Sequence, residues 1–186
     1  MADQLERSAG TGQAAATAAP VGDPDRRQYL EHLKKINDVF YDQIKIADQK
    51  AAYVFTFMVA FLVTSSEGRS AFRLERYQSG DPVLIGVSLL LGLAAVICVV
   101  SAILVVLPRH RAGKASSLYW GAWSANRDEF VVAEQRADPN YLRDEYLSNI
   151  DNLSAINRSK YRSVTMSFRA LMVVVVAYVL LLAYAA

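Results

Sequence analysis

Three long runs of uncharged, mostly apolar residues divide the sequence, and the charged residues lie between them. The runs cover residues 51–66, 82–108 and 170–186. A helix needs about 20 apolar residues to cross the roughly 30 Å hydrocarbon core of a bilayer. The second run meets this length by itself. The first is only about 24 Å long as a helix and needs snorkelling by Lys50, and the third needs the residues from Val164 onward with Arg169 snorkelling. The pattern predicts three transmembrane helices, at about 47–66, 82–108 and 166–186.

The segment before the first run has the pattern of an amphipathic helix. Asp23, Pro24 and Asp25 are typical of a helix start. From there one face recurs in steps of three and four residues: Leu30, Leu33, Asn37, Phe40, Ile44, Ala47 and Ala51. We therefore expect one helix of about 40 residues, polar over 24–50 and apolar after it. Residues 1–22 show no such pattern and lack the apolar core of a signal peptide, so we expect a disordered tail.

Two further amphipathic patterns lie in the polar segment 109–165. Pro108 is expected to end the second span, a helix is expected over 111–137, and Asp138-Pro139-Asn140 predicts a restart that runs without a break into the third span. The three polar segments have matched lengths, so each would project roughly 40 Å from one membrane face. The predicted fold is an all-α membrane protein. It has three transmembrane helices extended by long cytoplasmic helices that form a stalk-like bundle, within a single unit 23–186.

The apolar stripes of the stalk segments are too narrow for independent folding. We expect them to pack on one another or on copies of the same chain, as a homo-oligomer.

The distribution of Lys and Arg near the span ends predicts orientation. The segments on one side carry eleven: Lys34, Lys35, Lys45, Lys50, Arg109, Arg111, Lys114, Arg158, Lys160, Arg162 and Arg169. The short segment 67–81 carries three: Arg69, Arg73 and Arg76. We expect a multi-pass protein of the bacterial inner membrane, with a cytoplasmic N-terminus, segment 67–81 outside and a periplasmic C-terminus.

Charge and motif content argue against several classes of function. The formal net charge is only +2 and basic residues alternate with acidic ones, so no nucleic-acid partner is expected. Cys98 is the single cysteine, and His32 and His110 are the only histidines, without a neighbouring catalytic or ligand pattern. Phosphate-loop, nucleophile-elbow and zinc-protease motifs are absent from the sequence. We expect no enzyme activity, no catalytic residues, no metal and no cofactor.

The place where the stalk meets the bilayer is the best candidate for a ligand site. Lys50 is the last residue of the first polar segment, and Arg158, Lys160 and Tyr161 precede the third span. Basic side chains beside an aromatic ring suit an anionic ligand, by charge and by stacking. The same residues also suit anchoring to anionic lipids of the inner leaflet, and the sequence leaves both readings open.

The order of these parts resembles a known family. The junction Ala47-Asp48-Gln49-Lys50-Ala51 enters an aromatic-rich span, a hairpin follows, and a polar segment ending near Asn157-Arg158-Ser159-Lys160-Tyr161 leads to a last span. This resembles the transmembrane effectors of Pycsar, the pyrimidine cyclase system for antiphage resistance in bacteria. In that junction Ala47, Asp48, Lys50 and Ala51 carry the resemblance.

The resemblance implies an effector that responds to cyclic UMP or cyclic CMP made by a partner pyrimidine nucleotidyl cyclase. It would then impair the inner membrane and cause abortive infection. The alternative is a membrane anchor or scaffold subunit for a cytoplasmic partner. A nucleotidyl cyclase encoded next to this chain would favour the effector.

Overall fold

A computed structural model describes residues 23–78, 80–108 and 116–185. The expected disordered tail and the basic residues Arg109, Arg111 and Lys114, with His110, lie outside the described residues. Three long helices dominate: α1 (Asp23–Thr64), α4 (Pro82–Val106) and α6 (Pro139–Ala185). Three shorter ones connect them: α2 (Ser66–Ser70), α3 (Leu74–Tyr77) and α5 (Trp123–Gln135). The described part of the chain contains helices and no strands, as predicted.

The three long helices are each long and apolar enough to cross a membrane, which confirms the predicted number of candidate spans among the described residues. Their starts follow from local chemistry. Asp81 caps α4, since its carboxylate accepts from the amides of Val83 and Leu84 at 2.9 and 3.2 Å, and Pro82 occupies the first turn. Asp138 accepts in the same way from the Asn140 amide at 2.9 Å, so the predicted restart begins α6.

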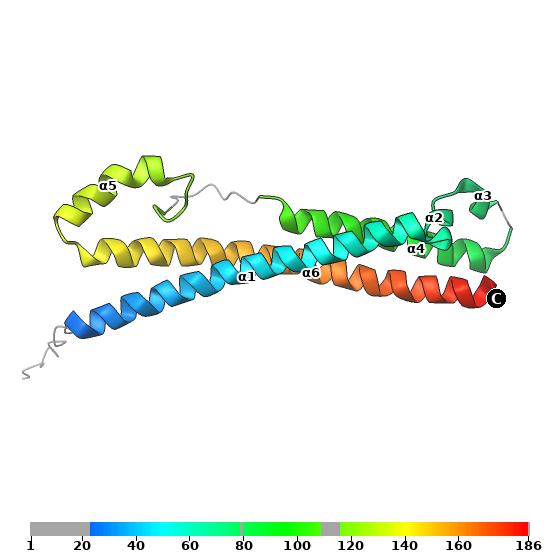
Figure 1. Ribbon diagram of the computed structural model, residues 1–186, viewed down its shortest axis with the longest axis horizontal. Helices are drawn as coiled ribbons and strands as arrows, with labels where there is room; N and C mark the ends of the chain where they lie inside the picture. The colour runs from blue at the N-terminus through cyan, green and yellow to red at the C-terminus, as the bar shows by residue number, and fades with distance from the viewer. Residues whose placement is uncertain (1–22, 79, 109–115, 186) are drawn as a thin grey trace, which may run out of the picture.

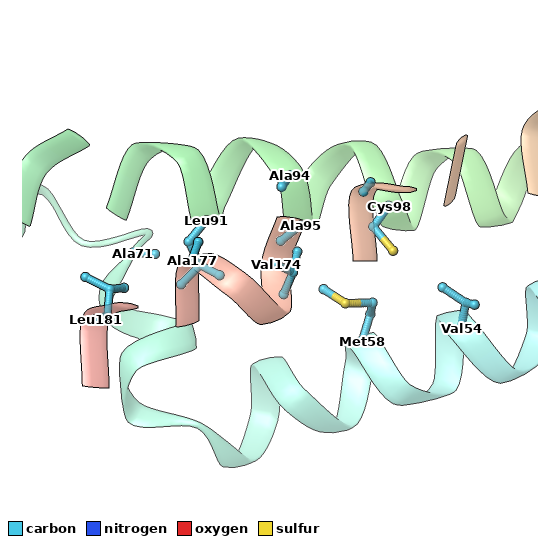
Figure 2. Close-up of a cluster of buried hydrophobic side chains, with 11 residues drawn as sticks. Val54, Met58, Ala71, Leu91, Ala94, Ala95, Cys98, Val174, Ala177 and Leu181 are labelled. Carbon is cyan, nitrogen blue, oxygen red and sulfur yellow. The ribbon is translucent and has the colours of Figure 1, made fainter. Parts of the chain in front are cut away.

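The long helices pack side by side over the apolar half of the molecule (Figure 1). Helices α1 and α6 run parallel to each other, and α4 runs antiparallel to both. The register of α4 and α6 is fixed by Ser167, whose hydroxyl donates to the Cys98 carbonyl at 3.1 Å, and by Tyr184, whose hydroxyl donates to Asp81. Small residues of α4 such as Ala94 and Ala95 are buried, which permits close approach of the helices. Figure 2 shows the core that results.

The predicted face of α1 is the one that packs. Asn37, Ala47, Ala51, Val54 and Met58 are all buried along one stripe of α1. On α6 the corresponding stripe contains Asn149, Leu153, Lys160, Val164 and Ser167. We call the polar parts of these two helices, residues 25–50 and 139–160, the stalk. Both helices continue from the stalk into the apolar region without interruption.

The helix predicted over 111–137 is present only as α5, and the described residues 116–122 before it are not helical. Helix α4 ends at Val106, residues 116–122 form turns, and the only described helix between α4 and α6 is α5, with 13 residues. The Ser116 hydroxyl accepts from the Leu118 amide at 3.1 Å, a local bond that competes with helix formation, and Gly121 further lowers helix propensity. Among the residues that the structure describes, two helices therefore form the stalk.

Helix α5 lies beside the first turns of α6, at the end of the stalk far from the apolar region (Figure 1). The Phe130 ring meets the Tyr141 ring at a centroid distance of 6.3 Å. Before α5, the Ser116 hydroxyl donates to the Glu145 carboxylate at 2.8 Å. These contacts hold α5 to α6, although no described residue of α5 is buried.

Candidate functional site

An ion pair joins the two stalk helices at the base of the stalk. The Lys160 ammonium contacts the Asp48 carboxylate across the α1–α6 interface. The Lys160 side chain is 7% exposed and that of Asp48 is 37% exposed. A cation this deeply buried is stable only with a partner. Lys160 is therefore engaged by α1, and its ammonium does not face open solvent.

Tyr161 lies next to this pair and also contacts α1. Its hydroxyl donates to the Gln43 side-chain carbonyl, and the Lys50 ammonium lies 5.9 Å from the centre of its ring. This distance is within the range of a cation–π contact. Of the four residues predicted to bind ligand, the structure thus brings Lys50, Lys160 and Tyr161 together at the stalk base.

Buried amides continue the polar contacts along the stalk. The Asn149 side-chain amide donates to the Asn37 side-chain carbonyl at 2.6 Å, and Asn157 donates to the Phe40 carbonyl at 3.0 Å. Such polar pairs in an otherwise apolar interface specify the register of parallel helices. The side-chain oxygen of Asn157 is buried and has no partner among the described residues.

Arg158, the fourth predicted residue, points elsewhere and lines an open hollow between α6 and the C-terminal end of α4. The hollow has a volume of about 680 Å³. Its lining comprises Ser101, Leu104, Arg158, Tyr161, Arg162, Ser163, Thr165, Met166 and Arg169. We call it the basal hollow. It combines three arginines with one aromatic ring, and no acidic residue belongs to its described lining.

A second basic hollow lies at the far end of the stalk, between the first turns of α1 and α6. It has a volume of about 690 Å³. Its basic and aromatic lining residues are Arg26, Arg27, Tyr29, His32 and Arg143. We call it the distal hollow. No sequence pattern predicts the distal hollow, because Arg26 and Arg143 belong to different helices and only the parallel pairing of α1 with α6 brings them together.

The described residues contain no group of three or more His, Cys, Asp or Glu side chains placed to hold a metal ion. The chemistry that the two hollows offer is recognition of an anion. Arginine is suited to this because its planar guanidinium donates paired hydrogen bonds to phosphate oxygens. A tyrosine ring beside it can stack on a planar group of the same ligand.

Comparison with known proteins yields one family and no individual relative. No curated protein matches the chain, and no solved structure matches it. The model of the Pycsar effector protein domain matches residues 32–186, from the third turn of α1 through all three long apolar helices to the last residue. The junction residues 47–51 and the stalk-base residues Lys160 and Tyr161 lie within this match. Because the match covers most of the chain, the chain belongs to the Pycsar effector family.

Proposed function

We propose that this protein is a membrane effector of antiphage defence that is switched on by a cyclic pyrimidine nucleotide. A partner pyrimidine nucleotidyl cyclase would supply cyclic UMP or cyclic CMP, and the activated effector would impair the inner membrane and cause abortive infection. The protein itself would carry no enzyme activity and no cofactor. Membership of the Pycsar effector family supports this proposal.

The structural observation that carries the proposal is the continuity of α1 and α6 from the stalk into the apolar region. A ligand shifts a conformational equilibrium only if it binds two arrangements with different affinity. A ligand contact that changes the angle or register of the two stalk helices would also move two of the three spans, because no hinge separates each stalk helix from its span. The signal therefore needs no separate nucleotide-binding domain.

We place the nucleotide in the basal hollow. A cyclic mononucleotide carries one negative phosphodiester, which suits Arg158 and Arg162, and a flat base, which suits the Tyr161 ring. The basal hollow lies entirely within the residues matched by the family, whereas the distal hollow lies only partly within them, since Arg26, Arg27, Tyr29 and Leu30 precede the match. In this proposal Lys160 and Lys50 position the site: Lys160 holds α1 through Asp48, and Lys50 lies over the ring of Tyr161.

The proposal is tested by dye release from vesicles that contain the full-length protein. Cyclic UMP or cyclic CMP should trigger release, while cyclic AMP should not. Arg158→Gln should shift the dose response roughly tenfold to hundredfold to higher nucleotide, since a charge-assisted hydrogen bond contributes about 1.5 to 3 kcal/mol. Arg127→Gln is the matched control, because Arg127 lies on α5 with its side chain 64% exposed.

Two outcomes would redirect the proposal. If Arg158→Gln responds like the parent and Arg26→Gln shows the shift instead, the nucleotide occupies the distal hollow. If neither nucleotide causes release from vesicles in which insertion has been verified, the effector role is wrong and the membrane-anchor alternative is favoured.

Orientation in the membrane belongs to the same proposal. We place the stalk in the cytoplasm and residues 67–81, with the C-terminus, on the periplasmic side. In a Cys98→Ser background, an impermeant thiol reagent added to intact cells should label Gln78→Cys and leave Asp128→Cys unlabelled. The reverse pattern would invert the topology. Cross-linking in the membrane would test the proposed homo-oligomer, for which a band at a multiple of the monomer mass is expected.

A further inference from the structure

The segment between α1 and α4 does not extend beyond the helix ends but folds back along α4. Helix α1 ends at Thr64, and the chain then forms α2, a turn at Ala71 and Phe72, and α3. We call the described residues 65–78 and 80–81 the connector. A Cβ placed on Gly92 would lie 3.6 Å from the Ala71 carbonyl oxygen. Gly92 is ten residues after Pro82, so this contact lies about 15 Å along α4 from its outer end.

Two further contacts place the connector at the same depth. Ala71 is 2% exposed and belongs to the buried core together with Leu91 and Ala177 (Figure 2). The Arg76 guanidinium donates to the hydroxyl of Ser88 at 3.2 Å, about 9 Å along α4 from Pro82. Both short helices accordingly lie beside the outer half of α4 (Figure 1).

The connector is strongly charged at this depth. Arg76 forms an ion pair with Glu67 at 2.7 Å, and the two side chains are 19% and 23% exposed. Arg69 donates to the Val63 carbonyl near the end of α1, and both Arg69 and Arg73 lie on the exposed surface. Helix α4 is about 37 Å long and spans the whole hydrocarbon core. In a flat bilayer, the connector charges would therefore lie in the hydrocarbon of the outer leaflet, where each charge is costly.

A charged residue of α6, Arg169, also lies within the apolar region, on the side of the stalk. Ser167 is level with Cys98 through their hydrogen bond, so Arg169, two residues farther along α6, is level with about Val96 of α4. From Val96 to Ser88 is eight residues, or about 12 Å along the helix. These eight residues set the height of the uncharged belt of the protein, between the level of Arg169 and the level of Arg76. Snorkelling by Arg169 toward the stalk lengthens this belt, but the belt remains shorter than the roughly 30 Å core of a bilayer.

We infer that the connector is a polar wedge in the outer half of the membrane that draws phospholipid headgroups and water toward Arg69 and Arg73. Lipids adapt to a short uncharged belt by thinning locally. The protein should therefore lower the barrier to movement of phospholipids between leaflets even without nucleotide. This inference deepens the proposed impairment of the membrane and rests on the proposed function only for the placement of the three spans.

The test measures lipid movement across vesicles that contain the full-length protein without nucleotide. Vesicles of dioleoyl phosphatidylcholine carry a trace of fluorescent phosphatidylcholine, and dithionite bleaches only the lipids that reach the outer leaflet. We expect movement roughly tenfold faster than in protein-free vesicles, equivalent to 1.4 kcal/mol. The acceleration should grow from dimyristoleoyl to dierucoyl lipid, since the mismatch increases with thickness.

Variants connect the effect to the connector. The double variant Arg69→Leu/Arg73→Leu should return the rate to within about twofold of protein-free vesicles, whereas Arg127→Leu on α5 should keep the parent rate. Because Arg69 also contacts the end of α1, Arg73→Leu alone provides a variant that leaves this contact intact and should lower the rate partially. A rate equal to that of protein-free vesicles, or a double variant as fast as the parent, would overturn the inference.

A spin label gives an independent reading. In a Cys98→Ser background, a nitroxide at Leu74→Cys, which is 79% exposed on α3, should collide with a water-soluble nickel reagent. A nitroxide at Leu93→Cys on α4, about level with the connector, should collide mainly with oxygen. Oxygen-dominated collisions at both positions would mean an unthinned bilayer and would refute the wedge. Because neither experiment uses nucleotide, loss of nucleotide gating would leave this inference standing, and its failure would leave gating untouched.

Discussion

Removing either partner of the Asp48–Lys160 pair should destabilise the protein, but by unequal amounts. Asp48→Leu leaves the Lys160 ammonium, only 7% exposed, without a counter-charge, and a loss of about 3 kcal/mol is expected. Lys160→Met leaves the Asp48 carboxylate, which is 37% exposed and can recover water, so about 1 kcal/mol is expected. The asymmetry follows from the burial of the two side chains, not from the strength of their bond.

The assay is thermal unfolding of the full-length protein in detergent, followed by circular dichroism. For a chain of this size 1 kcal/mol shifts the Tm by roughly 2–4 °C, so Asp48→Leu should lose roughly 6–12 °C and Lys160→Met roughly 2–4 °C. The double variant Asp48→Leu/Lys160→Met buries two apolar side chains and should recover most of the loss of Asp48→Leu.

The exposed pair between Lys45 and Asp42 supplies the control. Its atoms are 3.5 Å apart and its side chains are 73% and 66% exposed. Lys45→Gln should therefore change the Tm by less than about 2 °C. Equal losses for the two single variants of Asp48 and Lys160, or a double variant as unstable as Asp48→Leu, would refute the reasoning from burial.

Three further predictions concern other parts of the fold. Asn37→Ala should cost about 1–3 kcal/mol in the same thermal assay because the Asn149 amide loses its partner, while leucine at both positions should be nearly neutral but should let engineered cross-links form in more than one register. Gly68→Ala should cost about 1–3 kcal/mol, since the new methyl group would lie 2.9 Å from the Phe61 ring, and a Tm equal to that of the parent would contradict this. The hydrogen bonds that Asp81 accepts from Tyr184 and from the Leu84 amide hold its pKa below the ordinary value of 3.8. The stabilisation that the charged Asp81 gives to the fold is therefore complete above pH 3.8 and is lost as the pH falls through the lowered pKa. The protection factor of the amides in the last turn of α6, which compares the observed exchange with the intrinsic rate at the same pH, should therefore fall in acid in the parent and should be low at every pH in Tyr184→Phe.

Much of this architecture follows from local sequence pattern. The uncharged runs identify the three apolar helices, and the three-and-four spacing from Leu30 to Ala51 identifies the packing face of α1. Capping residues such as Asp138 mark where α6 begins. These features are predictable because helix periodicity and capping depend on residues within a few positions of one another. The exception is segment 111–137, where the hydrogen bond from the Leu118 amide to Ser116, together with Gly121, opposes a helix over residues 116–122.

The site depended on contacts that no local pattern encodes. The sequence predicted that Lys50, Arg158, Lys160 and Tyr161 lie near one another. It did not predict that Lys160 forms an ion pair with Asp48 while Arg158 lines the basal hollow. Neighbouring residues on a helix point about 100° apart, so one residue of rotation decides which partner helix a side chain meets. That rotation is set by the parallel packing of α1 on α6.

The connector shows most clearly the difference between what the sequence predicts and what the tertiary structure decides. Its glycines and charges predicted an external loop, and the first uncharged run was already too short for a full span. Only the tertiary structure showed that the missing length is occupied by the connector, which folds against Gly92 and Ser88 of α4. The sequence determines which segments are apolar helices, because that is a property of each segment alone. Their register, and hence the depth at which each charge lies, is decided by packing between segments that are far apart in the chain.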